Sequence, residues 1–517
     1  MKRSRRRKAM KKRRAAQAVA AAMAGLMLMT GCSSGGSGGD SGSADGDYTQ
    51  VTFATWTINT MPSEDAIQTV EDAINEITRE EIGVEVDLKL YSYTDYFQQI
   101  SLGMQGGEKI DVFTTYGNFS NAVSTDMCMD ITDLIEEHAP DALELINDDW
   151  LNATTVDGKV YGIPAWMPTA LATNVLYRSD IAEELGIDMS QVQSVEDLTD
   201  ILRQVKEAYP NIYPVVGGAG VNGGMSGLTV SIPQIDYLGD DMYSPAGVLI
   251  GDDTTVVNLF ETEEYKEMVT LARQWHEEGL IMQDLATTTL SNVEILSGGN
   301  GFLNITLQGS SPDAVANGTA AQTGQQLASF NLGNGYLDTA TVNTNAWCIA
   351  STSEVPEAAL DFLNLTYSNA DIINLIVYGI EGRDYEVQED GSVAPPEGQD
   401  ATSVPYPGYY ILTGSWSMGE MYRMAGTTEE DVQFSIEANN NAECSPALGF
   451  TFQKDSVQTE YTAVSNVIKQ YYSALECGSV DPEEELPNFI QALKDAGIDT
   501  IIAEKQAQLD EWLANNQ

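Results

Sequence analysis

The sequence predicts an α/β protein built from two lobes, and the first lobe has the pattern of a doubly wound and mostly parallel sheet. Length is the first reason, because about 470 residues follow a short N-terminal leader and tether, which is more than one hydrophobic core usually serves. The second reason is that residues 51–117 alternate between strand and helix patterns in the order β-α-β-α-β. Right-handed crossovers convert that order into neighbouring parallel strands.

The first three elements can be assigned from their periodicity. Residues 51–56 (VTFATW) are rich in β-forming side chains and predict a strand. A helix is expected from the N-cap Ser63 to the stop at Gly83, and residues 84–92 (VEVDLKLYS) alternate as a strand does. The apolar stripe of that helix consists of Ile67, Val70, Ile74 and Ile77.

A second helix and a third strand complete the pattern. The helix precedes Gly106-Gly107, and residues 110–117 (IDVFTTYG) form the strand. One face of the helix carries the apolar side chains of Tyr96, Phe97, Ile100 and Met104.

Open parallel sheets bind ligands at the carboxyl ends of their strands. Trp56 follows the first predicted strand, and Tyr116 and Asn118 follow the third. Rings and amides at one sheet edge suit a sugar, whose apolar face stacks on a ring while its rim accepts hydrogen bonds. The alternative is that Trp56 and Tyr116 only plug the edge of the sheet.

The N-terminus predicts secretion. MKRSRRRKAMKKRR contains ten Lys and Arg residues and no acid, and a small, apolar, Ala-rich run follows it at residues 15–30. This order is typical of a secretory signal peptide. The run is too short for a membrane-spanning helix, which needs roughly 20 strongly apolar residues. Residues 1–31 are therefore expected to be removed.

The junction Leu28-Met29-Thr30-Gly31-Cys32 resembles the lipobox of bacterial lipoproteins. That resemblance implies that the Cys32 thiol is acylated and becomes the new N-terminus, so that the chain touches the membrane only through this lipid anchor. Residues 32–47 form a Gly/Ser-rich tether with almost no apolar side chain. The expected location is the extracytoplasmic face of the cell membrane. The alternative is an ordinary signal peptide with an incidental cysteine, and the Gram type of the host stays open.

The charge balance narrows the possible partners. The whole chain has a net charge of −52, and without the ten leader cations 15 Lys and Arg face 77 Asp and Glu, a net charge of −62. Phosphate backbones and anionic headgroups repel such a surface, so nucleic acid is excluded as a partner. An anionic small ligand is also disfavoured.

Cysteine and histidine usage predicts neither a metal site nor a cofactor. Beyond Cys32 the cysteines are Cys128, Cys348, Cys444 and Cys477, none in C-x-x-C spacing, and the only histidines are His138 and His276. Disulfide pairing stays open. After the tether, the sequence also lacks the G-x-S-x-G, H-E-x-x-H and phosphate-loop motifs. We therefore expect a non-enzyme, with a surface glycoside hydrolase or an adhesin as the alternatives.

Several segments in order resemble the extracellular solute-binding proteins of ABC importers, in the carbohydrate-type family 1. Residues 108–117 (EKIDVFTTYG) look like the family strand that ends in the ligand cleft, with Lys109-Ile110 in place of the usual Pro. Residues 157–188 contain YGIP and LYR and look like the crossover between lobes, and 194–210 look like the helix that follows. Residues 301–311 and 343–387 look like the return to the first lobe.

The end of that return segment, YGIEGRDYE, is followed by YPGYY and resembles a subgroup with an extended C-terminal domain of uncharacterised function. The resemblance implies a periplasmic-binding-protein-like fold of type II, in which each lobe has a doubly wound and mostly parallel sheet. A hinge of several strands joins the lobes, which close on the ligand. It also implies a monomer that captures a sugar or oligosaccharide and delivers it to ABC transporter permease subunits. A peptide ligand is the alternative. The implied domains are 1–31 signal, 32–47 tether, 48–163 plus 344–378 lobe 1, and 164–343 plus 379–517 lobe 2.

The same segments supply further candidate ligand contacts. These are Trp166 and Met167 after YGIP, Trp347 in the return segment, Glu381, Arg383 and Tyr385 in YGIEGRDYE, and Trp416 in a Gly/Ser-rich loop. Large aromatic side chains are buried more often than they bind ligands, so core packing is the alternative for Trp347 and Trp416. For Arg383 the alternative is a local salt bridge with a neighbouring acid.

Overall fold

The computed structural model describes residues 48–217, 228–240, 242–288, 290–407, 411–416, 418–419 and 421–516. The expected signal peptide, Cys32 and the tether lie outside the described residues. From Tyr48 onward the chain forms one unit of contacts.

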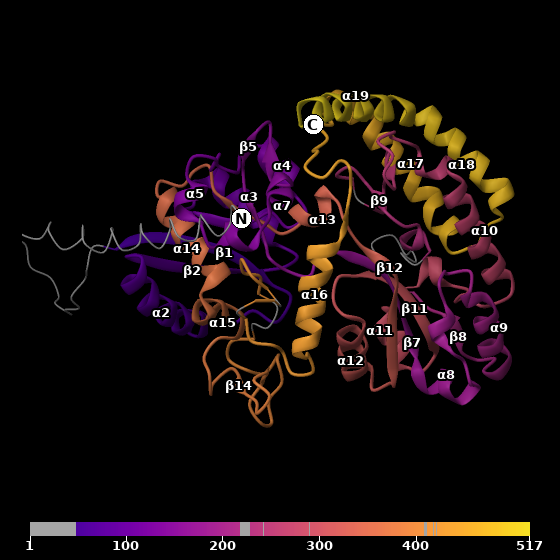
Figure 1. Ribbon diagram of the computed structural model, residues 1–517, viewed down its shortest axis with the longest axis horizontal. Coiled ribbons are helices and arrows are strands. Elements are labelled where there is room, and N and C mark those ends of the chain that lie inside the picture. The colour runs from indigo at the N-terminus through magenta and orange to yellow at the C-terminus, as the bar shows by residue number, and fades with distance from the viewer. Residues whose placement is uncertain are drawn as a thin grey trace, which may run out of the picture. The chain divides into compact units, whose positions relative to one another are not determined.

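The first lobe is built on a sheet with the strand order β2-β1-β3-β13-β6 (Figure 1). Its strands are β1 (Thr49–Thr57), β2 (Val84–Ser92), β3 (Val112–Thr114), β6 (Ile163–Pro164) and β13 (Ala346–Ile349). Strand β1 pairs in parallel with β2 and β3, whereas β13 runs antiparallel to β3 and β6. The three strands predicted from periodicity therefore form, and their carboxyl ends share one edge of the sheet.

Helices cover this sheet, and the best-predicted one, α2, follows from its caps. The Ser63 side chain accepts a hydrogen bond from the Ala66 N–H at 3.3 Å, and the helix ends just before Gly83, whose φ of 69° a side chain would disfavour. The helices are α2 (Glu64–Glu81), α3 (Tyr96–Gly106), α4 (Phe119–Ser124), α5 (Ile135–His138), α6 (Ala142–Leu145), α7 (Asp148–Asn152), α14 (Pro356–Ser368) and α15 (Ala370–Tyr378). A short hairpin of β4 (Thr155–Val156) and β5 (Lys159–Val160) precedes β6.

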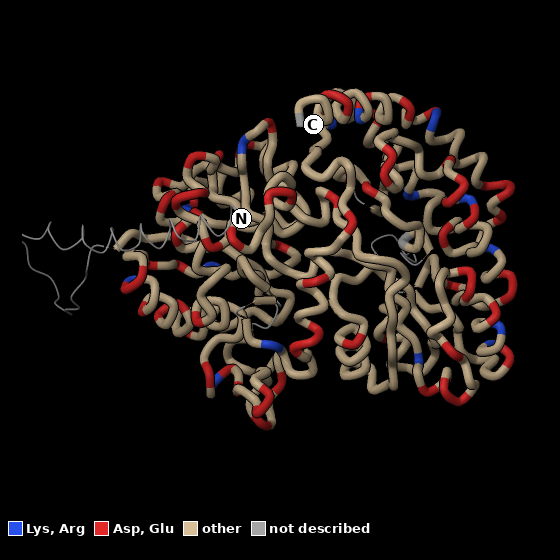
Figure 2. The backbone as a smooth tube through the Cα atoms, viewed as in Figure 1, with Lys and Arg blue, Asp and Glu red and all other residues tan. Residues whose placement is uncertain are grey.

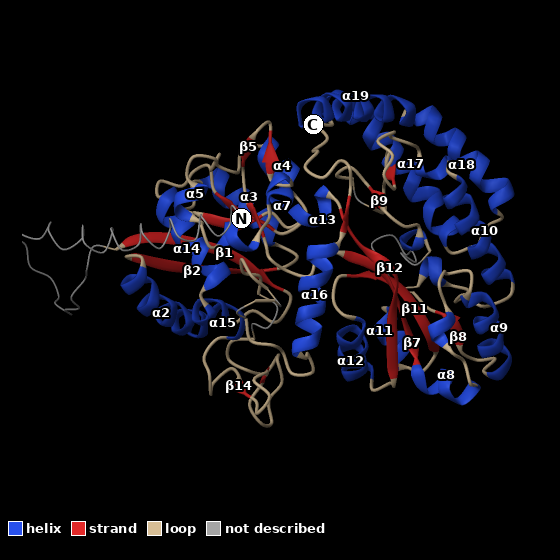
Figure 3. Cartoon of the chain, in the orientation of Figure 1, coloured by secondary structure: helices blue, strands red, loops and turns tan. Residues whose placement is uncertain are grey.

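The second lobe has a mixed sheet with the order β16-β12-β7-β11-β8, shown with its helices in Figure 3. Its strands are β7 (Leu171–Arg178), β8 (Tyr213–Val215), β11 (Gly301–Gln308), β12 (Leu327–Leu337) and β16 (Glu443–Cys444). The expectation of a mostly parallel sheet needs correction here, because the central strand β7 is antiparallel to both β11 and β12. Helix α12 connects β11 to β12 across the intervening β7, which enters from the first lobe in the opposite direction.

Helices and short strands surround the second sheet. The helices are α8 (Ser179–Leu185), α9 (Leu198–Ala208), α10 (Glu263–Glu277), α11 (Asn292–Ser297) and α12 (Pro312–Thr323). Single 3₁₀ turns occur at Met189–Gln191, Thr229–Ser231, Leu259–Glu261, Leu285–Thr287 and Asp455–Val457. Strands β9 (Ile235–Asp236) and β10 (Leu249–Ile250) form a two-stranded antiparallel pair.

Two segments described here cross between the lobes, and α16 (Glu429–Asn441) binds one of them. Residues 165–170 connect β6 to β7, and α13 (Thr339–Asn343) lies between β12 and β13. The Asn439 side chain of α16 accepts hydrogen bonds from the Thr169 and Ala170 N–H groups, both at 3.0 Å, and donates to the Met167 carbonyl at 2.8 Å. One amide thus satisfies three backbone groups of the crossing segment.

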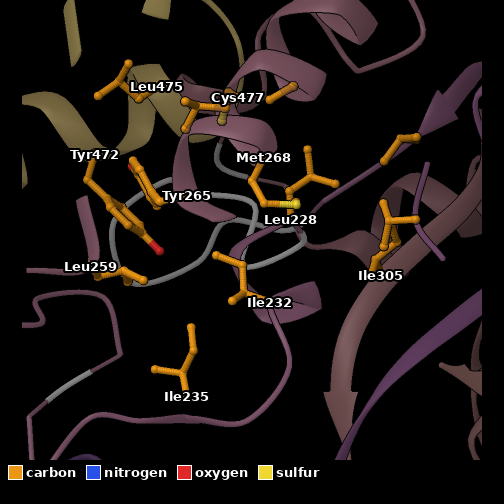
Figure 4. Packing of buried hydrophobic residues seen from close by; sticks show 14 of the residues in the cluster. Leu228, Ile232, Ile235, Leu259, Tyr265, Met268, Ile305, Tyr472, Leu475 and Cys477 are labelled. Carbon is orange, nitrogen blue, oxygen red and sulfur yellow. The ribbon is translucent and has the colours of Figure 1, made fainter. Parts of the chain in front are cut away.

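Three C-terminal helices share the core of the second lobe. They are α17 (Gln458–Glu476), α18 (Pro482–Ala496) and α19 (Ile498–Asn516). The Phe260 ring lies 4.6 Å from that of Phe489 and 6.4 Å from that of Tyr472. In Figure 4, Tyr472, Leu475 and Cys477 lie around Tyr265 and Met268 of α10. These helices are therefore built into the second lobe.

The described part of segment 379–421 packs against a different lobe from the one expected. We expected this segment in the second lobe, but Val393, Val404 and Met421 cluster with Ile373 and Val377 of α15, a helix of the first lobe. The segment also contains the short hairpin of β14 (Glu386–Val387) and β15 (Val393–Ala394). Apolar burial against α15 explains its position.

Acidic residues are spread over both lobes, and the few Lys and Arg residues lie among them (Figure 2). Among the described residues, no helix has the length and apolarity needed to cross a membrane.

Candidate ligand cleft

Three aromatic rings meet at the carboxyl edge of the first-lobe sheet. Trp56 comes from the end of β1, Tyr93 follows β2 and Tyr116 follows β3. The Trp56 ring centroid lies 4.8 Å from that of Tyr116 and 5.5 Å from that of Tyr93, and the two tyrosine rings are 5.1 Å apart. The Tyr116 hydroxyl donates to the Tyr93 hydroxyl at 2.9 Å. We call these three residues the aromatic triad.

The members of the triad differ in exposure. Tyr93 is 42% exposed and Tyr116 is half-buried, whereas Trp56 is only 9% exposed. The buried Trp56 Nε1 has no hydrogen-bond partner among the described residues. Burial and the Tyr93 hydroxyl raise the pKa of Tyr116 above its usual value, so the hydroxyl stays protonated and able to donate. The triad therefore exposes two tyrosine rings that pack against the buried indole of Trp56.

Backbone geometry ties the triad to the connection between the lobes. Tyr116 adopts a left-handed φ of 36°, which a non-glycine residue rarely does. The next N–H, of Gly117, donates to the Thr344 carbonyl at 2.6 Å. Thr344 directly follows α13 and also lines a cavity in the second lobe. A hydrogen bond therefore joins the end of β3 to a residue of the cavity wall.

The second lobe contains a cavity of about 780 Å³ on one face of its sheet. Its wall includes parts of β7, β11 and β12, of the start of α10, of α13, and of residues 193–196, 231–235, 237, 240 and 242. Among the described lining residues none is Lys or Arg, and six are acidic: Glu196, Asp240, Glu264, Glu267, Asp338 and Glu443. An anionic ligand would meet repulsion there, whereas hydroxyl groups would find many acceptors.

A bulge in β12 places polar side chains in this cavity. The pairing of β12 with β7 shifts between Leu332 and Tyr336, and both Asn334 and Tyr336 line the cavity. Gly335 is required at the bulge, because a Cβ there would lie 2.9 Å from the Ala170 Cβ. The Tyr336 hydroxyl is buried without a hydrogen-bond partner among the described residues. The bulge thus brings an amide side chain and a hydroxyl-bearing side chain to the cavity wall.

Two buried carboxyl groups lie beside Tyr336. Burial and, to a lesser extent, the nearby charge of Asp338 together raise the pKa of Asp236 to about 7. Burial also raises the pKa of Asp338, the N-cap of α13. Asp236 accepts hydrogen bonds from the Ser445 hydroxyl and, at 2.6 Å, from the Leu238 N–H. These groups connect the cavity wall to the start of the crossing helix α13.

Comparison with known families identifies the class of protein to which the chain belongs. Residues 72–377 match the family model described as "Bacterial extracellular solute-binding protein", which is more than half of the chain. The chain belongs to this family. Residues 446–514 match a second model, described as "Domain of unknown function (DUF3502)", and correspond to α17, α18 and α19. As a solute-binding protein, the chain binds its solute and is not an enzyme.

Relatives of this solute-binding protein cover nearly its whole length. A "Carbohydrate ABC transporter substrate-binding protein" from Streptococcus pneumoniae serotype 4 is 27% identical over 450 residues, 86% of this chain and 87% of the relative. The crystal structure of the N-glycan transport solute binding protein from Streptococcus pneumoniae superposes with a TM-score of 0.77 at 25% identity, covering 91% of this chain and 100% of the other. Its complex with Man5GlcNAc superposes with a TM-score of 0.64 at 25% identity, covering 91% and 99%. These matches show the two-lobed fold.

The solute-binding protein places some predicted contacts away from the triad. Trp347 is fully buried, with its ring stacked 4.8 Å from that of Phe53 and its Nε1 donating to the Thr413 carbonyl at 3.0 Å. It is a core residue with no surface left for a ligand. Trp166 is also buried, with its ring 5.3 Å from that of Trp150.

The remaining contacts predicted outside the YGIEGRDYE segment serve mainly local structure. The Met167 sulfur accepts a hydrogen bond from the Asn345 side chain at 3.3 Å. The backbone N–H of Trp416 donates to the Trp166 carbonyl at 2.9 Å, and the side-chain amide of Asn118 donates to the Tyr116 carbonyl at 3.2 Å. Asn118 is therefore the one among them that directly adjoins the triad.

The YGIEGRDYE segment forms a structural turn. Arg383 forms an ion pair with Asp384, with 2.6 Å between the Arg383 Nη2 and the Asp384 Oδ2. The Asp384 carboxylate also accepts a hydrogen bond from the Ile380 N–H at 2.8 Å. Tyr385 is buried against Tyr378, whereas Glu381 is exposed. The local salt bridge, weighed above as the alternative for Arg383, is what the structure contains.

Sequence reasoning missed Tyr93 and Tyr336. A signal for Tyr93 was present, because it follows the second parallel strand as Trp56 and Tyr116 follow the first and third. No comparable signal marked Tyr336, since its position depends on the bulge in β12.

Proposed function

We propose that this solute-binding protein captures a neutral oligosaccharide between its lobes and delivers it to the permease subunits of an ABC importer. The observation that carries the proposal is the aromatic triad, placed at the carboxyl ends of three parallel strands and linked to a cavity whose described lining residues include no cation. Aromatic faces stack on the apolar faces of sugar rings, while amides and hydroxyls bind the hydroxyl rim.

The two sides of the cleft offer complementary contacts. Tyr93 and Tyr116 supply rings from the first lobe, and Trp56 positions them from behind. From the second lobe, Asn334 and Tyr336 supply an amide and a hydroxyl. A peptide with a free carboxylate would lack a cationic partner at these described positions, so a neutral saccharide fits better.

The relatives support a carbohydrate ligand. One is named for carbohydrate transport and another for N-glycan transport, with a solved complex with Man5GlcNAc, and each covers at least 86% of this chain. Coverage on this scale includes both lobes and the C-terminal helices.

Closure of the lobes on the ligand is part of the proposal. The chain superposes better on the neighbour described without a sugar than on the same protein with Man5GlcNAc, with TM-scores of 0.77 and 0.64. An open starting form gives this order. Saturating ligand should then reduce the radius of gyration in solution scattering, and an unchanged curve would argue for a rigid groove.

Anchoring through Cys32 and work as a monomer complete the proposal. The lipobox-like Leu28–Cys32 and the Gly/Ser tether would hold the binding unit near the permease, on the extracytoplasmic face of the membrane.

The proposal is tested by thermal stabilisation and calorimetric titration against matched ligands. The panel contains Man5GlcNAc, a neutral glucose oligosaccharide, a uronic-acid oligosaccharide and a peptide of similar size. Ligand at 100 times its Kd should stabilise the fold by about 2.7 kcal/mol through mass action, and no product should appear. We expect stabilisation by a neutral saccharide; stabilisation by the peptide alone would refute the proposal.

A further inference from the structure

One loop supplies much of the cavity wall yet has little regular structure of its own. We define the cavity loop as residues 232–240 and 242–250. It contributes Ile232, Pro233, Gln234, Ile235, Tyr237, Asp240 and Met242 to the wall. Among the described residues, its regular pairing consists of β9 with β10, two residues on each strand, and a single antiparallel bridge between Val248 and Val257. Its position must therefore come from what packs against it.

A buried ion pair joins the cavity loop to the C-terminal helices. The Lys505 ammonium of α19 lies 2.6 Å from the Asp240 carboxylate and donates to the Gly247 carbonyl at 2.9 Å. The two side chains are 0% and 3% exposed. The Tyr461 hydroxyl of α17 donates to the other carboxylate oxygen of Asp240, and the Ala246 N–H donates to the first at 2.7 Å. Asp240 is thus bound by two C-terminal helices and by its own loop.

Close packing at Gly247 points to the same contact. Its φ is +108°, and a Cβ there would lie 3.1 Å from Ile502 and 3.4 Å from Lys505, both on α19. Only glycine allows the loop backbone to approach the helix this closely. The loop and α19 therefore fit each other through both charge and shape.

Further hydrogen bonds between the loop region and the C-terminal helices lie on either side of the ion pair. Ser244 and Ser465 of α17 are bonded through their hydroxyls at 2.9 Å. The Gln506 side chain of α19 accepts the Val256 N–H at 2.7 Å and donates to the Thr254 carbonyl at 3.1 Å. The helices hold the loop and the chain that leaves it at several points.

We infer that the C-terminal domain (residues 446–514) shapes the ligand cavity, and that Lys505 is a positioning residue that fixes the cavity loop through Asp240. Lys505 itself does not line the cavity. It acts through the loop, whose Gln234 and Tyr237 line the cavity. This inference rests on the proposed function for its effect on sugar binding, but its structural part holds for the free protein.

The first arm of the test needs no ligand. Hydrogen–deuterium exchange is measured on peptides covering residues 232–250 in Lys505→Met and in wild-type protein. Removal of the ammonium leaves Asp240 buried without its charged partner, which weakens the local fold. We expect at least tenfold faster exchange in the cavity loop, with helices α2 and α14 of the first lobe unchanged.

The second arm measures binding of the panel saccharide that stabilises the wild-type protein. Lys505→Met should weaken its affinity roughly tenfold, mainly through faster dissociation, because the loop no longer holds its binding conformation. The double variant Lys505→Met with Asp240→Asn leaves no buried charge unpaired, and it serves in both arms if the single variant does not fold.

Two controls separate positioning from general destabilisation. Lys494 of α18 forms an exposed ion pair with Glu261 at 2.6 Å, so Lys494→Met removes an ammonium from the same domain without touching the loop. Leu509→Ala removes a fully buried side chain from α19 and lowers overall stability. Neither should change loop exchange selectively or sugar affinity at 25 °C.

The outcomes are distinguishable. Wild-type exchange in the loop and wild-type affinity in a folded Lys505 variant would overturn the inference, as would equal effects from Leu509→Ala. If wild-type protein binds no saccharide of the panel, the proposed function fails, and the exchange arm alone still decides whether Lys505 fixes the loop.

Discussion

Replacement of Glu476 by glutamine should stabilise the protein at alkaline pH and leave it almost unchanged at acidic pH. Glu476 ends α17 and is 2% exposed, and neither of its carboxyl oxygens has a hydrogen-bond partner of good geometry among the described residues. Burial raises its pKa from 4.5 to about 7, an effect that the nearby Thr229 and Tyr265 hydroxyls only partly offset. The folded state therefore prefers the protonated carboxyl.

The sign and size of the effect follow from proton linkage. Below pH 4.5 the group is protonated in both states. Between pH 4.5 and 7 the unfolded chain releases the proton that the folded chain keeps, so the free energy of unfolding falls as pH rises. Above pH 7 the ionised group costs the fold about 3 kcal/mol as an upper bound, from the pKa difference. Glutamine removes this cost because it carries no charge.

The assay is guanidinium unfolding followed by circular dichroism at pH 5, 6, 7 and 8. Glu476→Gln should gain about 1–3 kcal/mol over wild type at pH 8 and little at pH 5. Glu437→Gln, an exposed acid on α16, is the matched control and should follow the wild-type profile. Because burial also raises the pKa of Asp236 to about 7, some pH dependence should survive in the variant. Equal loss of stability at every pH would show that the carboxylate is held by compensating contacts and would refute the reasoning.

Two further predictions concern the anchor and the cleft. Cys32→Ser should release the protein into the medium, since the lipid is the proposed attachment; retention on membranes after a high-salt wash would contradict the lipobox assignment. Tyr93→Ala should weaken saccharide binding by about 1–3 kcal/mol, roughly 5- to 150-fold, without changing the melting temperature, because Tyr93 is 42% exposed. Trp56→Ala should lower both affinity and melting temperature, because Trp56 is only 9% exposed. Calorimetric titration and thermal melting check both variants. Unchanged affinity in Tyr93→Ala would contradict a role for the triad in binding.

Local sequence patterns predicted the first lobe well because its elements are stabilised by near neighbours. The cap at Ser63, the stop before Gly83 and the alternation of residues 84–92 all appear as expected. The parallel pairing of β1 with β2 and β3 then brings Trp56 and Tyr116 together, as the strand-end argument requires.

The second lobe could not be predicted in the same way, because its contacts are distant in sequence. Strand β7 pairs with β11 and β12, which follow more than 100 residues later, so nothing local indicates that it runs antiparallel to both. In the first lobe, the burial of Trp347 likewise depends on Phe53 and Thr413, which lie far from it in the sequence on either side. Burial of this kind is a property of the assembled lobe.

The three hydrogen bonds that Asn439 makes to residues 167–170 also determine where the molecule can bend. Gly335 packs directly on Ala170 from the other side, so the entry to β7 moves as one body with the second sheet. In this crossing segment, the proposed rotation of the lobes must then be absorbed upstream of Met167, beside the Trp166 and Trp150 rings, whose centroids are 5.3 Å apart. Tryptophan emission should therefore change with the proposed opening and closing of the lobes, and it would report that motion without an attached dye.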